Sequence, residues 1–268
     1  MPLDKNAAAR FHALHRDFLI LPNAWDAASA KLIERAGAAA IATSSAAVAW
    51  AHGYADGHDL PIAKLVTTVE EIARVVSAPI TADAEGGYAD DPSEVGENIA
   101  ALIGAGAVGI NLEDGRNPHT LHVRKIEAAR AAANRAGVDL YINARTDVFL
   151  KQLTQPEDAV EETLKRARAL RDAGASGLFV PLAMKPEDIR AIASEIGLPL
   201  NIMAWPGAPS AAVLKSLGAR RLSAATWMFR VAATALGQAA SAFLQDGDSD
   251  ALAALAGDRS DYNALIKG

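Results

Sequence analysis

Acidic side chains follow two successive apolar runs of the chain, at the points where strands of a parallel sheet would end. Residues 81–88 read Thr-Ala-Asp-Ala-Glu-Gly-Gly-Tyr, and residues 111–115 read Asn-Leu-Glu-Asp-Gly. Alternation along a strand sends Asp83 and Glu85 the same way, and Glu113 comes from the next strand. Three carboxylates at neighbouring strand ends repel one another unless a cation joins them, and oxygen ligands suit Mg²⁺ or Mn²⁺. We predict that they bind one divalent metal; the alternative is that they only cap the following helices.

A basic residue, Arg145, follows the next apolar run, in the sequence Ile-Asn-Ala-Arg-Thr-Asp of residues 142–147. A guanidinium beside a buried strand is costly without an anion, and its fork fits a carboxylate. We predict that Arg145 binds a substrate carboxylate; a salt bridge to the acids is the alternative, and both can hold together. The turn Ser44-Ser45-Ala46 offers successive N–H groups for an anion, a weaker signal because serine-rich turns are common.

The histidines give weaker signals than the acids. We expect His12 and His15 to be exposed on an N-terminal helix, and His119 and His122 to lie in the loop after the fourth strand. No histidine spacing supports a zinc site. A lone loop histidine is more often solvated than catalytic, although histidine is the commonest general acid or base.

These residues need a scaffold that brings many strand ends together. Eight runs read as strands: 18–23, 38–44, 79–84, 109–113, 140–144, 177–181, 200–204 and 221–225. Helical patterns lie between them: 27–36, 68–76, 92–104, 122–136, 157–173, 186–196 and 209–217. The junction helix, Ala-Gly-Ala or Leu-Gly-Ala, strand recurs four times, which is typical of the αβ loops of a parallel sheet. We therefore predict a (β/α)8 TIM barrel, whose function lies at the C-terminal ends of its strands.

The composition excludes several classes of function. The chain has 268 residues, 51% of them hydrophobic, and a formal net charge of −6, which argues against a nucleic-acid partner. It has no cysteine, so disulfides, thiolate metal sites and a cysteine nucleophile are excluded. Residues 1–16 look helical and lack the apolar core of a signal peptide, and we see no membrane span. We expect a single cytoplasmic domain over residues 1–268.

The C-terminal segment differs from the rest. Residues from Thr226 to about Gln245 form a long helical pattern that is rich in small residues and apolar on more than one side, and a further short helix follows. This excess of apolar surface predicts burial against another subunit, so we assign residues 226–268 to oligomerisation.

Six segments match, in order and spacing, those of one enzyme superfamily. They are residues 21–30 (Leu-Pro-Asn-Ala-Trp-Asp-Ala-Ala-Ser-Ala), 43–45 (Thr-Ser-Ser), 53–56 (Gly-Tyr-Ala-Asp), 83–88, 111–114 and 144–147. Together they resemble the isocitrate lyase and phosphoenolpyruvate mutase superfamily, although each alone is a weak signal. The match covers about the first two thirds of the chain, and Asn201-Ile202 is a fainter echo.

The resemblance implies a barrel whose eighth helix is swapped between subunits, in a homodimer or homotetramer. It also implies a Mg²⁺ held by Asp83, directly or through water, with help from Glu85 and Glu113. Asp56 matches a family aspartate near the metal. Mn²⁺ remains possible as the metal.

The substrate implied by the resemblance is a small 2-oxo or 2-hydroxy carboxylate. Its carboxylate would lie near Ser44, Ser45, Ala46 and Arg145, with Asn201 as a further contact, and its keto or hydroxyl oxygen would bind the metal. Bond cleavage would leave an enolate, stabilised by Mg²⁺ and Arg145. The candidate catalytic residues are therefore Arg145, Asp56 and Glu113.

Several positions depart from the family pattern. The lyases carry a lid motif with a cysteine acid after the fourth strand, where this chain reads Gly-Arg-Asn-Pro-His-Thr-Leu-His over residues 115–122. The mutases carry a lysine where Gly115 stands and a histidine near residues 179–182. Residues 203–207 (Met-Ala-Trp-Pro-Gly) lack the Thr-Glu of the lyases. The metal and carboxylate sites match, whereas the part that selects the leaving group differs.

We therefore predict a Mg²⁺-dependent lyase or hydrolase that cleaves a C–C or P–C bond and whose leaving group is smaller or more apolar than that of isocitrate. Trp205, Leu182 and Trp50 are expected to line that side. The replacement acid is expected among Arg116, His119 and His122. The alternatives are a class II-type metal-dependent aldolase and a catalytically degenerate relative that binds a metabolite.

Overall fold

The computed structural model describes residues 5–257 and 261–267, and its centre is one sheet of nine parallel strands. The sheet order is β1-β9-β8-β7-β6-β5-β4-β3-β2. The strands are β1 (Leu19–Leu21), β2 (Asn23–Ala24), β3 (Ile41–Thr43), β4 (Ile80–Asp83), β5 (Ala107–Glu113), β6 (Tyr141–Arg145), β7 (Gly177–Phe179), β8 (Leu200–Met203) and β9 (Arg221–Ser223). The two ends of this order, β1 and β2, are consecutive in the chain, so the sheet curls into a TIM-type barrel, as predicted.

The ninth strand comes from a break in the first one. Pro22 separates β1 from β2 and has no backbone N–H to give to a ladder. Leu19–Leu21 therefore pairs with β9, and Asn23–Ala24 pairs with β3. The predicted strand over residues 18–23 thus corresponds to two short strands that together close the barrel.

Helices alternate with the strands along the barrel. They are α1 (Lys5–Leu14), α2 (Ala27–Arg35), α3 (Ser45–Ala51), α4 (Ile62–Val75), α5 (Pro92–Gly104), α6 (His119–Ala136), α7 (Ala159–Asp172, after the 3-10 turn Pro156–Asp158), α8 (Pro186–Glu195), α9 (Ala211–Ser216), α10 (Trp227–Asp246), α11 (Ser249–Ala256) and α12 (Tyr262–Lys267). The seven predicted helices between strands are confirmed within a few residues, apart from a later predicted start of α4. The short helix α3 was missed, and the tail contains two helices rather than one.

Local signals explain several helix ends. Asp91 accepts a hydrogen bond from the Ser93 N–H at the start of α5, with Pro92 in the first turn, as the N-cap preference requires. Gly137 ends α6 in the left-handed conformation with φ +66°, which glycine adopts without strain. These caps place each strand start, and hence each strand end, at a fixed height in the barrel.

The N-terminal helix closes one end of the barrel. Phe11 is fully buried, and a Cβ on Gly109 would lie 2.6 Å from its ring. The ring of His15 stacks on Tyr141 at 3.9 Å between centroids, and its Nδ1 bonds the Phe11 carbonyl oxygen. His15 is only 3% exposed, so the prediction that it is exposed was wrong: the residue lies past the helix end and turns inward. His12, by contrast, is partly exposed.

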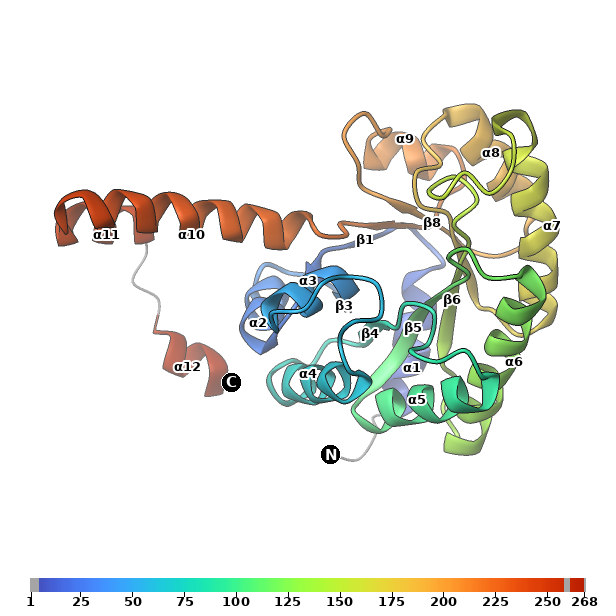
Figure 1. Cartoon of the computed structure of the whole chain (residues 1–268), viewed down its shortest axis with the longest axis horizontal. Helices are drawn as coiled ribbons and strands as arrows, with labels where there is room; N and C mark the ends of the chain where they lie inside the picture. Colours follow the sequence, from blue (N-terminus) through green and yellow to red (C-terminus); the bar gives the residue numbers. More distant parts are fainter. Residues whose placement is uncertain (1–4, 258–260, 268) are drawn as a thin grey trace.

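The helix α10 leaves the barrel and projects as an arm that continues into α11 (Figure 1). None of its residues is buried, and Leu236 and Leu244 are 72% and 84% exposed. No helix within the described residues is long and apolar enough to cross a membrane.

Candidate active site

Asp83 stands at the end of β4 and is held by the neighbouring strand and helix. Its Oδ2 accepts hydrogen bonds from the Ser45 N–H at 3.1 Å and from the Ser45 hydroxyl at 2.9 Å. Its own N–H donates to Thr43 Oγ1. Asn111 Nδ2 lies 3.5 Å from Oδ1. The predicted anion cradle at Ser44-Ser45-Ala46 therefore faces the predicted metal ligand, and the carboxylate of Asp83 itself bonds to it.

The cradle is the first turn of α3. Ser44 caps this helix through its hydroxyl, and Ser44, Ser45 and Ala46 are all buried. The strand-to-helix junction thus presents small side chains and backbone N–H groups beside Asp83. This position agrees with the prediction from sequence; that the turn binds a substrate remains a prediction.

Glu85 follows Asp83 in the left-handed conformation, with φ +48°, and is 4% exposed. Both of its carboxylate oxygens accept hydrogen bonds: Oε2 from the His58 N–H at 2.6 Å and Oε1 from the Tyr88 hydroxyl at 2.9 Å. Burial, together with the nearby charges of Asp83 and Asp56, raises its pKa from 4.5 to about 7. A cation nearby would oppose this shift.

Glu113 and Arg145 form a buried ion pair in register on β5 and β6. Arg145 Nη1 lies 2.5 Å from Glu113 Oε2, and Nε and Nη2 bond the two carboxylate oxygens of Asp147. Burial raises the pKa of Glu113 to about 8, although the charge of Arg145 opposes the shift. Burial alone would lower the pKa of Arg145, but Glu113 and Asp147 outweigh it and raise that pKa.

Arg145 retains capacity for a ligand. A guanidinium has five N–H groups, and these contacts use three of them, leaving one N–H on each terminal nitrogen. The ring of Phe179 lies 5.7 Å from the guanidinium carbon and covers it. Both alternatives drawn from the sequence are therefore compatible: the salt bridge to the acids exists, and two N–H groups remain for a carboxylate.

Asp56 lies on the loop between α3 and α4 and is exposed at the barrel mouth. Partial desolvation and the charge of Asp83 raise its pKa, while Arg145 lowers it, so Asp56 lies within electrostatic reach of the acid cluster. Asn201, on β8, is buried in the same row as Arg145, through Phe179. Its Nδ2 has no hydrogen-bond partner among the described residues, which is consistent with a predicted substrate contact.

The candidate replacement acids do not all reach the site. His119 and His122 belong to α6 rather than to a loop, so their predicted position was wrong. His122 is fully buried and bonds the Leu112 carbonyl oxygen, and burial lowers its pKa to about 4. His119 interacts electrostatically with Arg166 and Asp114. The helix starts at His119, directly after Pro118 at its N-cap position, three residues before the predicted start at residue 122.

A polar layer beneath Asp83 was missed from the sequence. Asn111 Oδ1 accepts hydrogen bonds from Asn143 Nδ2 at 2.9 Å and from Arg221 Nη2 at 3.4 Å. Arg221 is 1% exposed, and its Nε and Nη1 have no partner among the described residues. Burial lowers its pKa to about 10. These residues alternate with apolar ones on short strands, and this alternation could have predicted from the sequence that they point into the barrel.

The carboxylates of this site suit a hard divalent cation. Most of its ligands would be atoms that do not belong to the protein. Within residues 5–257 and 261–267, no three His, Asp or Glu side chains converge as a metal cluster. Burial raises the pKa values of Glu85 and Glu113, and the negative charge of nearby Asp83 adds to both shifts. Mg²⁺ commonly binds one or two carboxylates and keeps several waters. Asp83 could hold it, with Glu85 and Glu113 acting through water.

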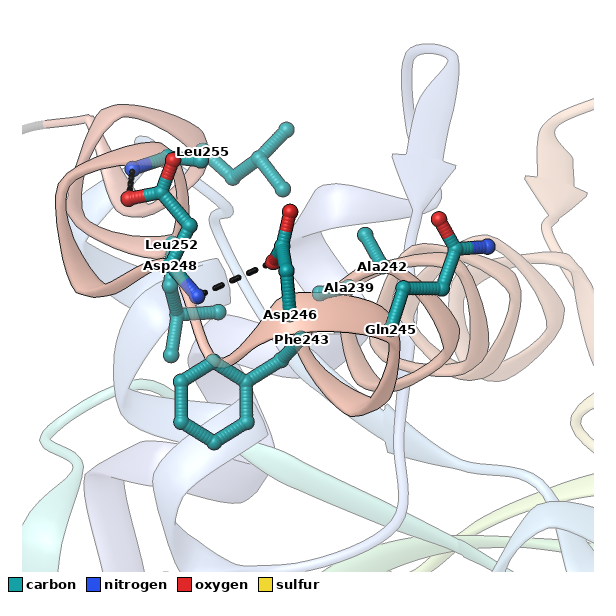
Figure 2. A pocket seen from close by; sticks show the side chains of 9 residues that line it. Ala239, Ala242, Phe243, Gln245, Asp246, Asp248, Leu252 and Leu255 are labelled. Carbon is teal, nitrogen blue, oxygen red and sulfur yellow. Dashed lines mark hydrogen bonds between the residues drawn. The ribbon is translucent and has the colours of Figure 1, made fainter.

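A separate hollow lies on the C-terminal arm. Figure 2 shows Phe243, Leu252 and Leu255 gathered where α10 meets α11, with Asp246 accepting a hydrogen bond from the Asp248 N–H. These aspartates serve the turn between the two helices. The hollow is mostly apolar and includes none of the acid-cluster residues, so it is separate from the candidate active site.

Comparisons with known proteins match this architecture. Residues 11–244 match the family model for phosphoenolpyruvate phosphomutase. An uncharacterized protein of Mycobacterium tuberculosis (strain ATCC 25618 / H37Rv) is 32% identical over 240 residues, which are 89% of this chain and 90% of the relative.

Two solved structures are similar over most of their length. A protein of Burkholderia cenocepacia J2315, described provisionally as a phosphonomutase, has a TM-score of 0.84 and 42% identity over 88% of this chain and 99% of its own. The structure of 2,3-dimethylmalate lyase, a member of the PEP mutase/isocitrate lyase superfamily, has a TM-score of 0.81 and 26% identity, covering 98% and 99%.

Proposed function

Because the chain belongs to the PEP mutase/isocitrate lyase superfamily, we propose that it is a Mg²⁺-dependent lyase that cleaves a C–C bond of a small 2-oxo or 2-hydroxy carboxylate. Members of this superfamily cleave C–C or P–C bonds in carboxylates. The observation that carries the proposal is the meeting of Asp83, Glu113 and Arg145 at adjacent strand ends.

Each residue of the site has a part in this reaction. The two spare N–H groups of Arg145 bind the substrate carboxylate, helped by the Ala46 N–H in the first turn of α3, while Ser45 holds Asp83. Asp83 holds the cation, which, when bound, polarises the 2-oxygen of the substrate. Arg145 then stabilises the negative charge that develops as the bond breaks. Glu113 keeps the guanidinium in place, and Asp56 faces the reacting atoms from the opposite loop.

The side that receives the leaving group is aromatic. Trp205 and Trp227 pack at 5.7 Å between ring centroids, and Phe229 links Trp25 to Trp50. These residues follow β8, β9, β2 and β3, so they flank the barrel mouth beside the acid cluster. This supports an apolar or small leaving group, as the similarity to 2,3-dimethylmalate lyase also does.

Calorimetry with oxalate, an analogue of a pyruvate enolate, tests the metal and carboxylate sites together. We expect wild-type protein to bind oxalate in Mg²⁺ at least about a hundredfold more tightly than in EDTA, in line with transition-state analogues. Asp83→Ala should abolish this Mg²⁺ dependence, whereas the control Asp139→Ala, on an exposed carboxylate, should not change it.

Two results would overturn this proposal. Mg²⁺-dependent oxalate binding that survives Asp83→Ala would exclude Asp83 as the metal ligand. Absence of binding in wild-type protein would favour a degenerate, metabolite-binding relative. If binding is confirmed, 2-oxo and 2-hydroxy acids can be screened for release of pyruvate or glyoxylate, and an aldehyde product would indicate the aldolase alternative.

The C-terminal arm supports assembly. We propose that α10 and α11 pack on a second copy of the chain in a homodimer or homotetramer. The side chains of Val231, Leu236 and Leu244 are exposed and give the arm a large apolar surface, which is typical of an interaction site. Light scattering should give at least twice the 27.9 kDa mass of the chain; a monomer at micromolar concentration would contradict it.

A further inference from the structure

Two loops at the barrel mouth bind each other through reciprocal hydrogen bonds. The His58 N–H donates to Glu85 Oε2 at 2.6 Å, and the Gly86 N–H donates to His58 Nε2 at 2.8 Å. The first loop is the segment of residues 53–60, which carries Asp56, and the second follows β4. The two bonds join His58 to residues 27 and 28 positions further along the chain, and each loop supplies one donor and one acceptor.

The second loop is the fixed half of this clasp. Lys125, a buried residue of α6, donates from Nζ to the Gly86 carbonyl oxygen at 2.8 Å. The Tyr88 hydroxyl donates to the other oxygen of Glu85. Glu85 and Tyr88 are both left-handed, with φ +48° and +59°, a conformation that persists only where surrounding contacts enforce it. The loop of residues 53–60 is exposed along most of its length, and His58, itself left-handed with φ +73°, is the residue that bonds it to the second loop.

The ring of His58 fits against Gly86 without spare room. A Cβ on Gly86 would lie 2.9 Å from His58 Cε1 and 3.1 Å from Nε2. Because Nε2 accepts the Gly86 N–H, the neutral ring carries its proton on Nδ1. His58 therefore binds as an acceptor, and its 3.5 Å distance to Glu85 Oε2 is not an ion pair in this state.

We propose that His58 is a positioning residue that clasps the loop of residues 53–60 onto the end of β4 and so holds Asp56 over the acid cluster. The role of Asp56 rests on the proposed function; the clasp itself does not. The loop would open when the contact between His58 and Gly86 breaks and close when it forms. The clasp would therefore determine how often Asp56 is in place before a substrate carboxylate binds.

Hydrogen exchange measured by mass spectrometry tests the clasp without any substrate. His58→Ala removes the bond from the Gly86 N–H but keeps the backbone N–H that bonds Glu85, so it should speed amide exchange in residues 53–60 by up to about tenfold, the effect expected for one lost hydrogen bond. Gly86→Ala should do the same, because its methyl group displaces the ring. The double variant should be no faster than either single variant, since the added methyl group has nothing to displace once the ring is gone.

Two further variants control the measurement. His58→Gln places an acceptor oxygen the same number of bonds from Cβ as Nε2 and should restore slow exchange. His12→Ala, the same chemical change at the opposite end of the barrel, should leave residues 53–60 unchanged. Unchanged exchange in His58→Ala, or additive effects in the double variant, would overturn the proposal.

Oxalate calorimetry in Mg²⁺ adds the second readout. His58→Ala and Gly86→Ala should both weaken oxalate binding, and His58→Gln should recover it. Faster exchange with unchanged oxalate affinity would overturn the positioning of Asp56. If wild-type protein does not bind oxalate, the proposed function fails, and the non-additivity of the exchange rates alone still decides whether the clasp exists.

Discussion

The barrel buries two arginines at different depths, and their surroundings are opposite. Arg145, near the mouth, contacts Glu113 and both oxygens of Asp147. Arg221, in the polar layer beneath Asp83, has a single long hydrogen bond to Asn111. It has no acidic partner within the described chain. The pKa of the first is raised by its acidic partners, and that of the second is lowered by burial.

This difference separates two reasons for burying a charge. At the mouth, acids outnumber bases, and Arg145 is matched to them with two N–H groups to spare for a ligand. In the lower layer, the guanidinium is enclosed by amide and aromatic groups, and Asn111 connects it to Asp83. Arg145 is thus held by carboxylates at and just after strand ends, whereas Arg221 has only a neutral acceptor, and burying its charge costs stability.

The largest expected effect is at the mouth. Arg145→Met should lower the free energy of unfolding by about 3–5 kcal/mol, because it leaves two buried carboxylates without their partner. It should also abolish oxalate binding. Urea unfolding and calorimetry measure both. Arg130→Met, which loses hydrogen bonds to the Gly174 carbonyl oxygen and the Ser176 hydroxyl at the opposite, N-terminal end of β7, should destabilise the protein and leave oxalate binding intact; equal loss of binding in both variants would contradict the role of Arg145.

The excess of carboxylates at the barrel mouth predicts that the stability of the protein depends on pH. The folded-state pKa of Glu85 is about 7 against an ordinary 4.5, so the folded protein binds this proton more tightly than the unfolded chain does. Stability should therefore fall as pH rises from about 4.5 to about 7, by up to ~3 kcal/mol at about 1.4 kcal/mol per pKa unit. Urea unfolding in EDTA at pH 4.5 and pH 8 measures the fall.

Glu85→Gln provides the matching control. It removes the titration while keeping one acceptor oxygen, so the difference in stability between the two pH values should shrink. Added Mg²⁺ should stabilise wild-type protein more at pH 8 than at pH 4.5. An unchanged pH dependence in Glu85→Gln would mean that another group of the cluster carries the proton.

The smallest expected effect is in the lower layer. Arg221→Met should leave stability unchanged or raise it by up to about 2 kcal/mol, because it removes two nitrogens without a hydrogen-bond partner, Nε and Nη1, and a lone buried charge. Asn111 Oδ1 keeps its bond from Asn143, so no acceptor is orphaned. Thermal melting compares the two proteins. A loss of more than about 1 kcal/mol would show that Arg221 has a partner beyond the protein groups described, such as ordered water.

The sequence was sufficient to predict the residues whose position follows from strand ends. Asp83, Glu113 and Arg145 each end a strand, and the αβ-loop glycines fixed the barrel. The split of the first strand at Pro22, the short helix α3 and the inward turn of His15 were not predicted, because tertiary contacts decide each of them.

Long-range pairs left no local pattern to read. The contact between His58 and Gly86 and the row of Asn111, Asn143 and Arg221 join residues that only the folded barrel brings together. The left-handed backbone at Glu85 and Tyr88 could not be predicted from the sequence either, because neither residue is a glycine. The metal set and the substrate contacts therefore stay predictions, supported by position.

The seam between β1 and β9 has a consequence for synthesis. Leu19 pairs with Arg221, so the barrel cannot close until more than two hundred residues have left the ribosome. Until then β1 and β8 are open edges with unpaired N–H and C=O groups, able to pair with other chains. A chain that a stop codon ends before residue 221 should therefore aggregate. A chaperone that binds nascent strands should keep the product soluble until β9 is made.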